Sequence, residues 1–214
     1  MPKNSMIHWN GNQLCAIDVE TTGLDPFIHE IIQIAILPLD SNCNPRKDTY
    51  PFYIEIIPEF PERRDAEAMS VHSRSLTDIM QRGHDKEKAK DLLVEWVNKL
   101  DLPLTKGGNY RCKIMPLWHN GKFDYCFILG WLGVELYGEL FHGLDRDTMH
   151  ASLFLNDKAA AHAEDVPFKK NKLSWLANVL DIEDDPTHDA LQDCVATAEV
   201  YKKMISQGLG LTVD

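Results

Sequence analysis

The sequence of 214 residues has no long apolar run, and its first ten residues lack an apolar segment behind a basic start. The longest apolar stretch, residues 31–39, is interrupted by Gln33 and Pro38. A membrane-spanning helix needs about 20 predominantly apolar residues. We therefore expect neither a secretory signal nor a membrane partner.

The sequence also lacks a recognisable cysteine motif. It has five cysteines, an odd number, and no two of them have CxxC spacing. Metal and redox sites built on thiols usually show such spacing, and secreted disulfide frameworks usually use an even number. The sequence therefore favours a reducing, cytoplasmic location in which the thiols are small core residues.

Positive charge is scarce as well, since 33 acidic residues face 22 basic ones and the formal net charge is −11. This balance argues against simple electrostatic capture of long duplex DNA, which normally needs a basic surface. It leaves open an enzyme that binds a few nucleotides through metal ions, because a bound cation reverses the local field.

The sequence does contain enough apolar residues, 44% of the total, for one substantial core. Strand-like runs at 13–19, 31–39 and 50–57 with short connections predict an antiparallel meander. Later segments predict strands over 112–118 and 144–147, helices over 86–100, 123–132, 148–155, 173–180 and 187–205, and a loop over 157–171. This order predicts a three-layer α/β domain on a mixed sheet.

Two carboxylates end the first predicted strand, in the segment Cys15-Ala-Ile-Asp18-Val-Glu20. Side chains alternate along a strand, so Asp18 and Glu20 face the same side. Two desolvated like charges this close are costly unless they are protonated or bridged by a cation. A strand that ends at Ile17, with both acids in solvent, is the alternative. The turn at 21–24 favours a functional pair, because it places backbone amides beside the acids.

A third acid follows the fourth predicted strand, in the segment His119-Asn-Gly-Lys-Phe-Asp124. The ends of strands are where α/β sheets bind their ligands. The helix dipole alone also explains an acid in the first turn of a helix, so a purely structural Asp124 is the alternative.

The third segment, His188-Asp189-Ala-Leu-Gln-Asp193, lies at the start of the last predicted helix. Asp189 and Asp193 are four residues apart and share a helix face, so helix geometry alone does not decide which of them serves a site. His188 joins Asp193 in one site only if His188 lies in an irregular segment ahead of the helix. A surface histidine beside solvated acids is the alternative.

Three separated segments thus place acids and one histidine at strand ends or helix starts. Oxygen ligands without cysteine or histidine clusters indicate Mg²⁺ or Mn²⁺ rather than zinc. Two such ions about 3.5–4 Å apart suit in-line attack on a phosphodiester.

The three segments resemble the exonuclease motifs of the DEDDh 3′→5′ exonucleases, a family that includes polymerase proofreading subunits, ribonuclease T and oligoribonuclease. The resemblance covers residues 13–204 and implies a ribonuclease H-like α/β/α fold on a five-stranded mixed sheet. We therefore expect an exonuclease domain at 13–206, between an N-terminal extension (1–12) and a short tail (207–214).

The same resemblance implies the roles of the site residues. Two Mg²⁺ or Mn²⁺ ions would be held by Asp18, Glu20, Asp124 and Asp193. His188 would be the general base, since an ordinary imidazole titrates near neutral pH. The products would be nucleoside 5′-monophosphates released one at a time from the 3′ end of a single strand.

Contacts to the terminal nucleotide are implied for Thr22, Leu24, His72, Asn120 and Phe123. His72 is followed by Ser73-Arg74, where the family has glycine and an aliphatic residue. A histidine that caps a helix or lies on the surface is the alternative at this position. Phe123 occupies a position where an aromatic ring can stack on a sugar or base.

Substrate and partners stay open at this point. Discrimination between DNA and RNA requires contacts at the 2′-hydroxyl, which no motif reveals. An exoribonuclease acting on RNA ends or short oligoribonucleotides is thus the alternative to a DNA enzyme of replication or repair, with a polymerase or a second copy as candidate partners. A catalytically inert binding or scaffold relative would be expected to lose some of the five residues, because an unpaired acid cluster costs stability.

Overall fold

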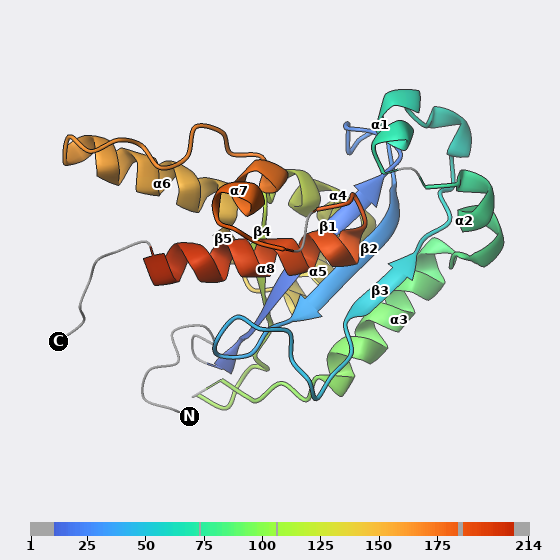
Figure 1. Cartoon of the computed structure of the whole chain (residues 1–214). Helices are drawn as coiled ribbons and strands as arrows, with labels where there is room; N and C mark the ends of the chain where they lie inside the picture. Colours follow the sequence, from blue (N-terminus) through green and yellow to red (C-terminus); the bar gives the residue numbers. More distant parts are fainter. Residues whose placement is uncertain (1–10, 73, 106, 184–185, 208–214) are drawn as a thin grey trace.

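The computed structural model describes residues 11–72, 74–105, 107–183 and 186–207. A five-stranded sheet in the order β3-β2-β1-β4-β5 forms its centre, with helices on both faces (Figure 1). This confirms the predicted three-layer α/β architecture. The proposed extension and tail fall largely outside the described residues, so the domain boundaries stay predictions. No helix in the described ranges is long and apolar enough to cross a membrane.

The strands lie within two residues of their predicted positions: β1 (Gln13–Thr21), β2 (Ile31–Pro38), β3 (Phe52–Glu55), β4 (Ile114–Trp118) and β5 (Arg146–Asp147). β1, β2 and β3 form the expected antiparallel meander. β4 and β5 add parallel to β1, which makes the sheet mixed. Every residue of β2 is buried, because helices cover both faces of the sheet.

The helices are α1 (Ala66–Val71), α2 (Leu76–Arg82), α3 (Lys86–Lys99), α4 (Lys122–Leu132), α5 (Val134–Leu140), α6 (Thr148–Ala161), α7 (Leu173–Val179) and α8 (Ala190–Gln207). The prediction that a loop begins at residue 157 is wrong. α6 continues to Ala161, because alanine has the highest helix propensity and Ala159 is buried. α8 begins at Ala190 rather than at residue 187.

Alternate residues of β1 belong to two different cores. Cys15, Ile17 and Val19 pack in the core that includes α3 and α4. Leu14 and Ala16 pack against α8, which presents small residues (Ala190, Cys194 and Ala198) that let the helix lie close to the sheet. α8 crosses this face of the sheet in Figure 1. Asp18 and Glu20 continue the even-numbered series, so both point to the face that α8 covers.

None of the five cysteines forms a disulfide, and four of them are buried as predicted for core residues. Burial raises the pKa of Cys43 to about 11, which keeps the thiol protonated and unreactive. The prediction is wrong for Cys126, which is exposed on α4.

Candidate active site

β1 carries the first two acids of the site. The strand continues through Thr21, so the alternative in which it ends at Ile17 is wrong. Glu20, only 9% exposed, lies opposite Gln33 of β2. Asp18 is partly buried beside it on the same face. The two carboxylates are therefore held in the fold and not in bulk solvent.

Asp124 contacts β1 beyond the point at which the pairing of β1 with β4 ends. β1 pairs with β4 only as far as Ala16, because the chain leaves β4 after Trp118 and turns into α4. Beyond that point the backbone N–H of Val19 donates to Asp124 Oδ1 at 3.0 Å. Asp124 is 3% exposed. A helix-dipole role alone does not account for a buried carboxylate bonded to a neighbouring strand.

The turn that delivers Asp124 is fixed by a second acid, Asp147. The two Asp147 oxygens accept the backbone N–H groups of Gly121 at 2.7 Å and Asn120 at 3.3 Å. Gly121 is required here, since a Cβ atom at this position would lie 2.3 Å from the ring of Trp118. The position of Asp124 thus depends on contacts of the whole turn.

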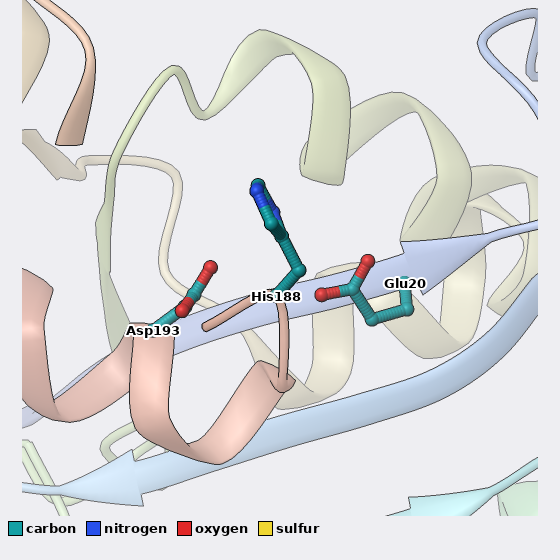
Figure 2. Close-up of side chains that lie close together, drawn as sticks. All are labelled: Glu20, His188 and Asp193. Carbon is teal, nitrogen blue, oxygen red and sulfur yellow. The ribbon is translucent and has the colours of Figure 1, made fainter. Parts of the chain in front are cut away.

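The third segment joins the others at the start of α8. Asp193 is 7% exposed and its Oδ1 accepts the N–H of Thr187 at 3.0 Å. His188 is exposed, has a φ of 56° and lies ahead of the helix, as a shared site with Asp193 requires. Ligand atoms of Glu20, His188 and Asp193 all lie within 4.8 Å of one another, and the three side chains are seen close together in Figure 2.

Asp18 and Asp124 lie outside that group of three, but their charges act on the same region. Burial and then the charges of Asp124, Asp193 and Glu20 raise the pKa of Asp18 well above its usual value. Burial is also the main cause that raises the pKa of Glu20 to about 8 and of Asp124 to about 8. Asp193 has its pKa raised chiefly by burial.

No lysine or arginine in the described ranges forms an ion pair with any of these four acids. Within the part of the chain that the structure describes, these four mutually repelling carboxyl groups therefore have no lysine or arginine in direct contact, and only the charge of Arg74 partly offsets the raised pKa of Glu20. This donor set suits a hard divalent cation.

Asp189 serves a different purpose from Asp193. Its Oδ1 accepts the N–H groups of Leu191 at 3.1 Å and Gln192 at 3.3 Å, so it caps α8. Its Oδ2 accepts a hydrogen bond from Tyr53 at 2.6 Å and pairs with Arg74. Helix geometry alone did not decide whether Asp189 or Asp193 serves the site. These contacts distinguish the two residues, because Asp193 faces the acid cluster and Asp189 faces β3.

The expected nucleotide contacts divide into buried and accessible residues. Thr22 is buried, and its Oγ1 accepts the N–H of Glu30 at 2.9 Å. Leu24, in contrast, is 76% exposed. Asn120 is exposed with a φ of 63°, whereas Phe123 is half-buried with its ring next to that of Phe127.

His72 is 6% exposed and lies at the C-terminal cap of α1. Its Nδ1 accepts the N–H of Arg74 at 3.1 Å, so Nε2 carries the hydrogen and donates to the carbonyl of Thr21 at 3.3 Å. The surface alternative for His72 is therefore wrong, and the side chain is bonded to the end of β1.

Sequence reasoning did not identify three residues beside the site: Gln33, Tyr53 and Arg74. Gln33 is fully buried, accepts the N–H of Ala190 at 2.9 Å and donates to the Tyr53 hydroxyl at 3.0 Å. The signal for Gln33 was present, since one amide in an otherwise apolar strand needs buried partners. Tyr53 and Arg74 carried no such signal.

Comparison with known proteins supports the same interpretation. The RNase T exonuclease family model matches residues 15–106, a range that contains Asp18 and Glu20 and ends before β4. Oligoribonuclease from Neisseria meningitidis serogroup A is 29% identical over 122 residues, which are 51% of this chain and 64% of that protein.

Two solved structures share the fold at low identity. Escherichia coli exonuclease I in complex with a dA16 oligonucleotide has a TM-score of 0.69 and 16% identity, over 91% of this chain and 41% of the other. Cell-death related nuclease 4 has a TM-score of 0.66 and 15% identity, over 93% of this chain and 65% of the other. The chain thus spans less than two thirds of the length of each of these relatives, and its fold is ribonuclease H-like.

The family match, the oligoribonuclease relative and the three motifs agree with one another, and the exonuclease family implies the use of divalent metal. The chain is therefore similar to RNase T-type exonucleases over residues 15–106 and shares the fold of exonuclease I over most of its length.

Proposed function

We propose that this chain is a metal-dependent 3′→5′ exonuclease that removes nucleoside 5′-monophosphates from the 3′ end of single-stranded nucleic acid. One observation carries the proposal. The only histidine of the third motif lies with Glu20 and Asp193 within 4.8 Å, in the same acid cluster as Asp18 and Asp124. The RNase T family match and the oligoribonuclease relative support the reaction class.

The residues of the cluster fit two Mg²⁺ or Mn²⁺ ions, which we propose as the cofactors. Asp18, Glu20, Asp124 and Asp193 offer only oxygen ligands, and their raised pKa values record the repulsion and burial that a cation would relieve. When bound, such ions would neutralise charge on the scissile phosphate and activate the attacking water.

His188 is the proposed general base. Its imidazole is exposed at the rim of the cluster, where an incoming water has access to it. The ring lies near both Glu20 and Asp193, so a ring nitrogen can accept the proton of a water that attacks at the cluster. Such a base contributes about 10²–10⁴-fold to the rate.

Nucleotide binding is proposed for the accessible side chains next to the acids in the chain. Leu24 and Asn120 are exposed, and Phe123 lies one residue before Asp124. Thr22 and His72 are proposed to shape the end of β1, since their polar atoms are bonded within the chain.

RNA is the second candidate substrate, and the oligoribonuclease relative is the observation that favours it. The exonuclease I structure, which contains single-stranded DNA, favours the first candidate at the level of the fold alone. A polymerase or a second copy of the chain remains a predicted partner.

The test uses single-stranded DNA and RNA of one sequence, labelled at the 5′ end and incubated with Mg²⁺, Mn²⁺ or EDTA. We expect a ladder that shortens from the 3′ end, depends on the metal and is abolished in Asp18→Asn. Asp91→Asn is the matched control, because Asp91 is exposed on α3, remote from the three motifs in the chain. The strand degraded faster assigns the substrate.

Three results would contradict the proposal. The first is an absence of cleavage with either metal, which would favour the inert binding relative. The second is a ladder that survives in EDTA. The third is wild-type activity in Asp18→Asn.

A further inference from the structure

The backbone of His188 adopts a conformation that its own side chain does not favour. Its φ of 56° lies in the left-handed region, which costs free energy for a residue with a Cβ atom. The residue is also exposed, so little packing holds it. The conformation must therefore be imposed by neighbouring residues.

The next residue, Asp189, is bonded on both sides. One oxygen caps α8 through the N–H groups of Leu191 and Gln192. The other accepts the Tyr53 hydroxyl at 2.6 Å and pairs with Arg74. A cap needs only one oxygen, so the second oxygen fixes Asp189 against β3 and against the segment that follows α1.

Further hydrogen bonds link the residues around Asp189 to β1 and β2. Gln33 links the N–H of Ala190 to the Tyr53 hydroxyl at 2.9 Å and 3.0 Å. Arg74 also lies 3.4 Å from Glu55 Oε1, and its backbone N–H is bonded to His72. His72 in turn is bonded to Thr21, the residue after Glu20. A continuous set of contacts therefore connects the strand of Glu20 to the loop of His188.

The charge of Asp189 is maintained in this setting. Burial opposes ionisation, but the hydrogen bonds from Tyr53 and Gln192 and the charge of Arg74 together lower the pKa of Asp189 below its usual value. The Asp189 and Arg74 side chains are each 22% exposed, so solvent screens their attraction less than it would at the surface.

We propose that Asp189 is a positioning residue that, through Arg74 and Tyr53, holds His188 at the acid cluster. The inference rests on the proposed function, since the role of His188 as general base belongs to it. It goes further in assigning a task to an acid that the proposed function uses neither as a metal ligand nor as a substrate contact.

Asp189→Asn separates this role from helix capping. Asparagine caps a helix about as well as aspartate, but its amide carries no charge for Arg74. We expect kcat to fall by about 10²-fold, the effect of a small misplacement of a reacting group. KM should change by no more than about twofold, because uniform substrate binding is not removed. Asp48→Asn, which breaks the exposed Arg46–Asp48 pair, is the matched control and should leave both constants unchanged.

A double-mutant cycle tests whether the loss passes through His188. In a His188→Ala background, Asp189→Asn should lower kcat by less than about threefold, because residues that act as a unit are strongly non-additive. A full 10²-fold loss in that background would overturn the inference. If Asp189→Asn does not fold, as judged by circular dichroism, Arg74→Lys replaces it in the cycle. Lysine keeps the charge but cannot contact Asp189 and Glu55 with two fixed nitrogens, as Arg74 does.

A second readout is independent of activity. The imidazole nitrogen signals of His188, assigned by their loss in His188→Ala, should broaden or shift in metal-free Asp189→Asn and not in Asp48→Asn. Unchanged signals would overturn the positioning role even if activity fell. Should the wild-type chain show no 3′→5′ cleavage, the proposed function fails, while these signals still report whether Asp189 holds His188.

Discussion

Asp124 is bonded to the backbone of β1 and is repelled by the acids around it. Its Oδ1 accepts the Val19 N–H, an interaction that an amide oxygen also provides. Its negative charge is opposed by burial and by the charges of Asp147 and Asp193, which contribute to a pKa of about 8. Replacing Asp124 by asparagine, which has the same shape, therefore keeps the hydrogen bond to Val19 and removes the negative charge.

Asp124→Asn should abolish cleavage and stabilise the metal-free protein. The variant keeps the hydrogen bond and removes one charge from the cluster. We expect the melting temperature in EDTA at pH 8 to rise by about 2–4 °C, the shift that about 1 kcal/mol produces in a chain of this size. Differential scanning calorimetry measures it, with Asp91→Asn as the control. A lower melting temperature would show that the carboxylate stabilises the fold without metal.

His188→Ala should lower kcat by about 10²–10⁴-fold while the fold is retained. The side chain is exposed, so the unfolding transition should stay close to that of the wild type. Steady-state kinetics on the preferred single strand gives the rate. A wild-type rate would remove His188 from the chemistry.

The turn between β4 and α4 has no space for a side chain at Gly121. An alanine Cβ would meet the buried Trp118 ring at 2.3 Å, whereas a Cβ at Gly130 of α4 meets no atom within 4 Å. Gly121→Ala should therefore lower the free energy of unfolding by about 1–3 kcal/mol. Gly130→Ala should raise it by up to about 1 kcal/mol, since alanine is the better helix former.

Urea unfolding of both glycine variants checks this prediction. A displaced turn also shifts Asp124, so Gly121→Ala should lose activity and Gly130→Ala should keep it. Equal stabilities of the two variants would contradict the close contact at Trp118.

The elements that the sequence predicts best are those in which one pattern dominates. β1 and β2 are predominantly apolar, and the acid pair of β1 is recognisable because it directly follows an apolar run. α1 and α2 were not predicted, since no residue of α1 is buried and Ile79 is the buried residue of α2. Their ends are set by caps such as Asp65 and Ser75 instead.

The start of α8 could not be placed for a related reason. Local sequence signals favoured a helix start at residue 187. In the structure α8 begins at Ala190, one residue after Asp189, which is bonded to Tyr53 and Arg74. Those partners lie more than 100 residues away in the chain. The same distant contacts give Asp189 a different role from Asp193. Local periodicity cannot predict this difference, because the two residues share a helix face.

For the whole molecule, the raised pKa values of the cluster make the stability of the metal-free protein depend on pH. A carboxyl group whose pKa is higher in the folded state stabilises the fold below its unfolded pKa, and this contribution is lost as the pH rises through the folded pKa. For Glu20 and Asp124 that window runs from about 4 to about 8. We expect the melting temperature in EDTA to be lower at pH 8 than at pH 6.

Mg²⁺ should counteract this loss, because it binds the ionised folded state. At a hundredfold excess over its Kd, a ligand adds about 2.7 kcal/mol of stability. The increase in melting temperature should be larger at pH 8 than at pH 5, and Asp18→Asn should reduce it. An increase independent of pH would indicate that Mg²⁺ binds elsewhere.

The position of α8 in the chain also has a consequence for biosynthesis. α8 is the last described element and supplies Asp193, while Asp18 and Glu20 lie on β1, the first strand. During translation the early strands therefore leave the ribosome long before their partners from α8. We expect stalled chains that end before Ala190 to cleave no single-stranded nucleic acid, because they lack the Asp193 carboxylate.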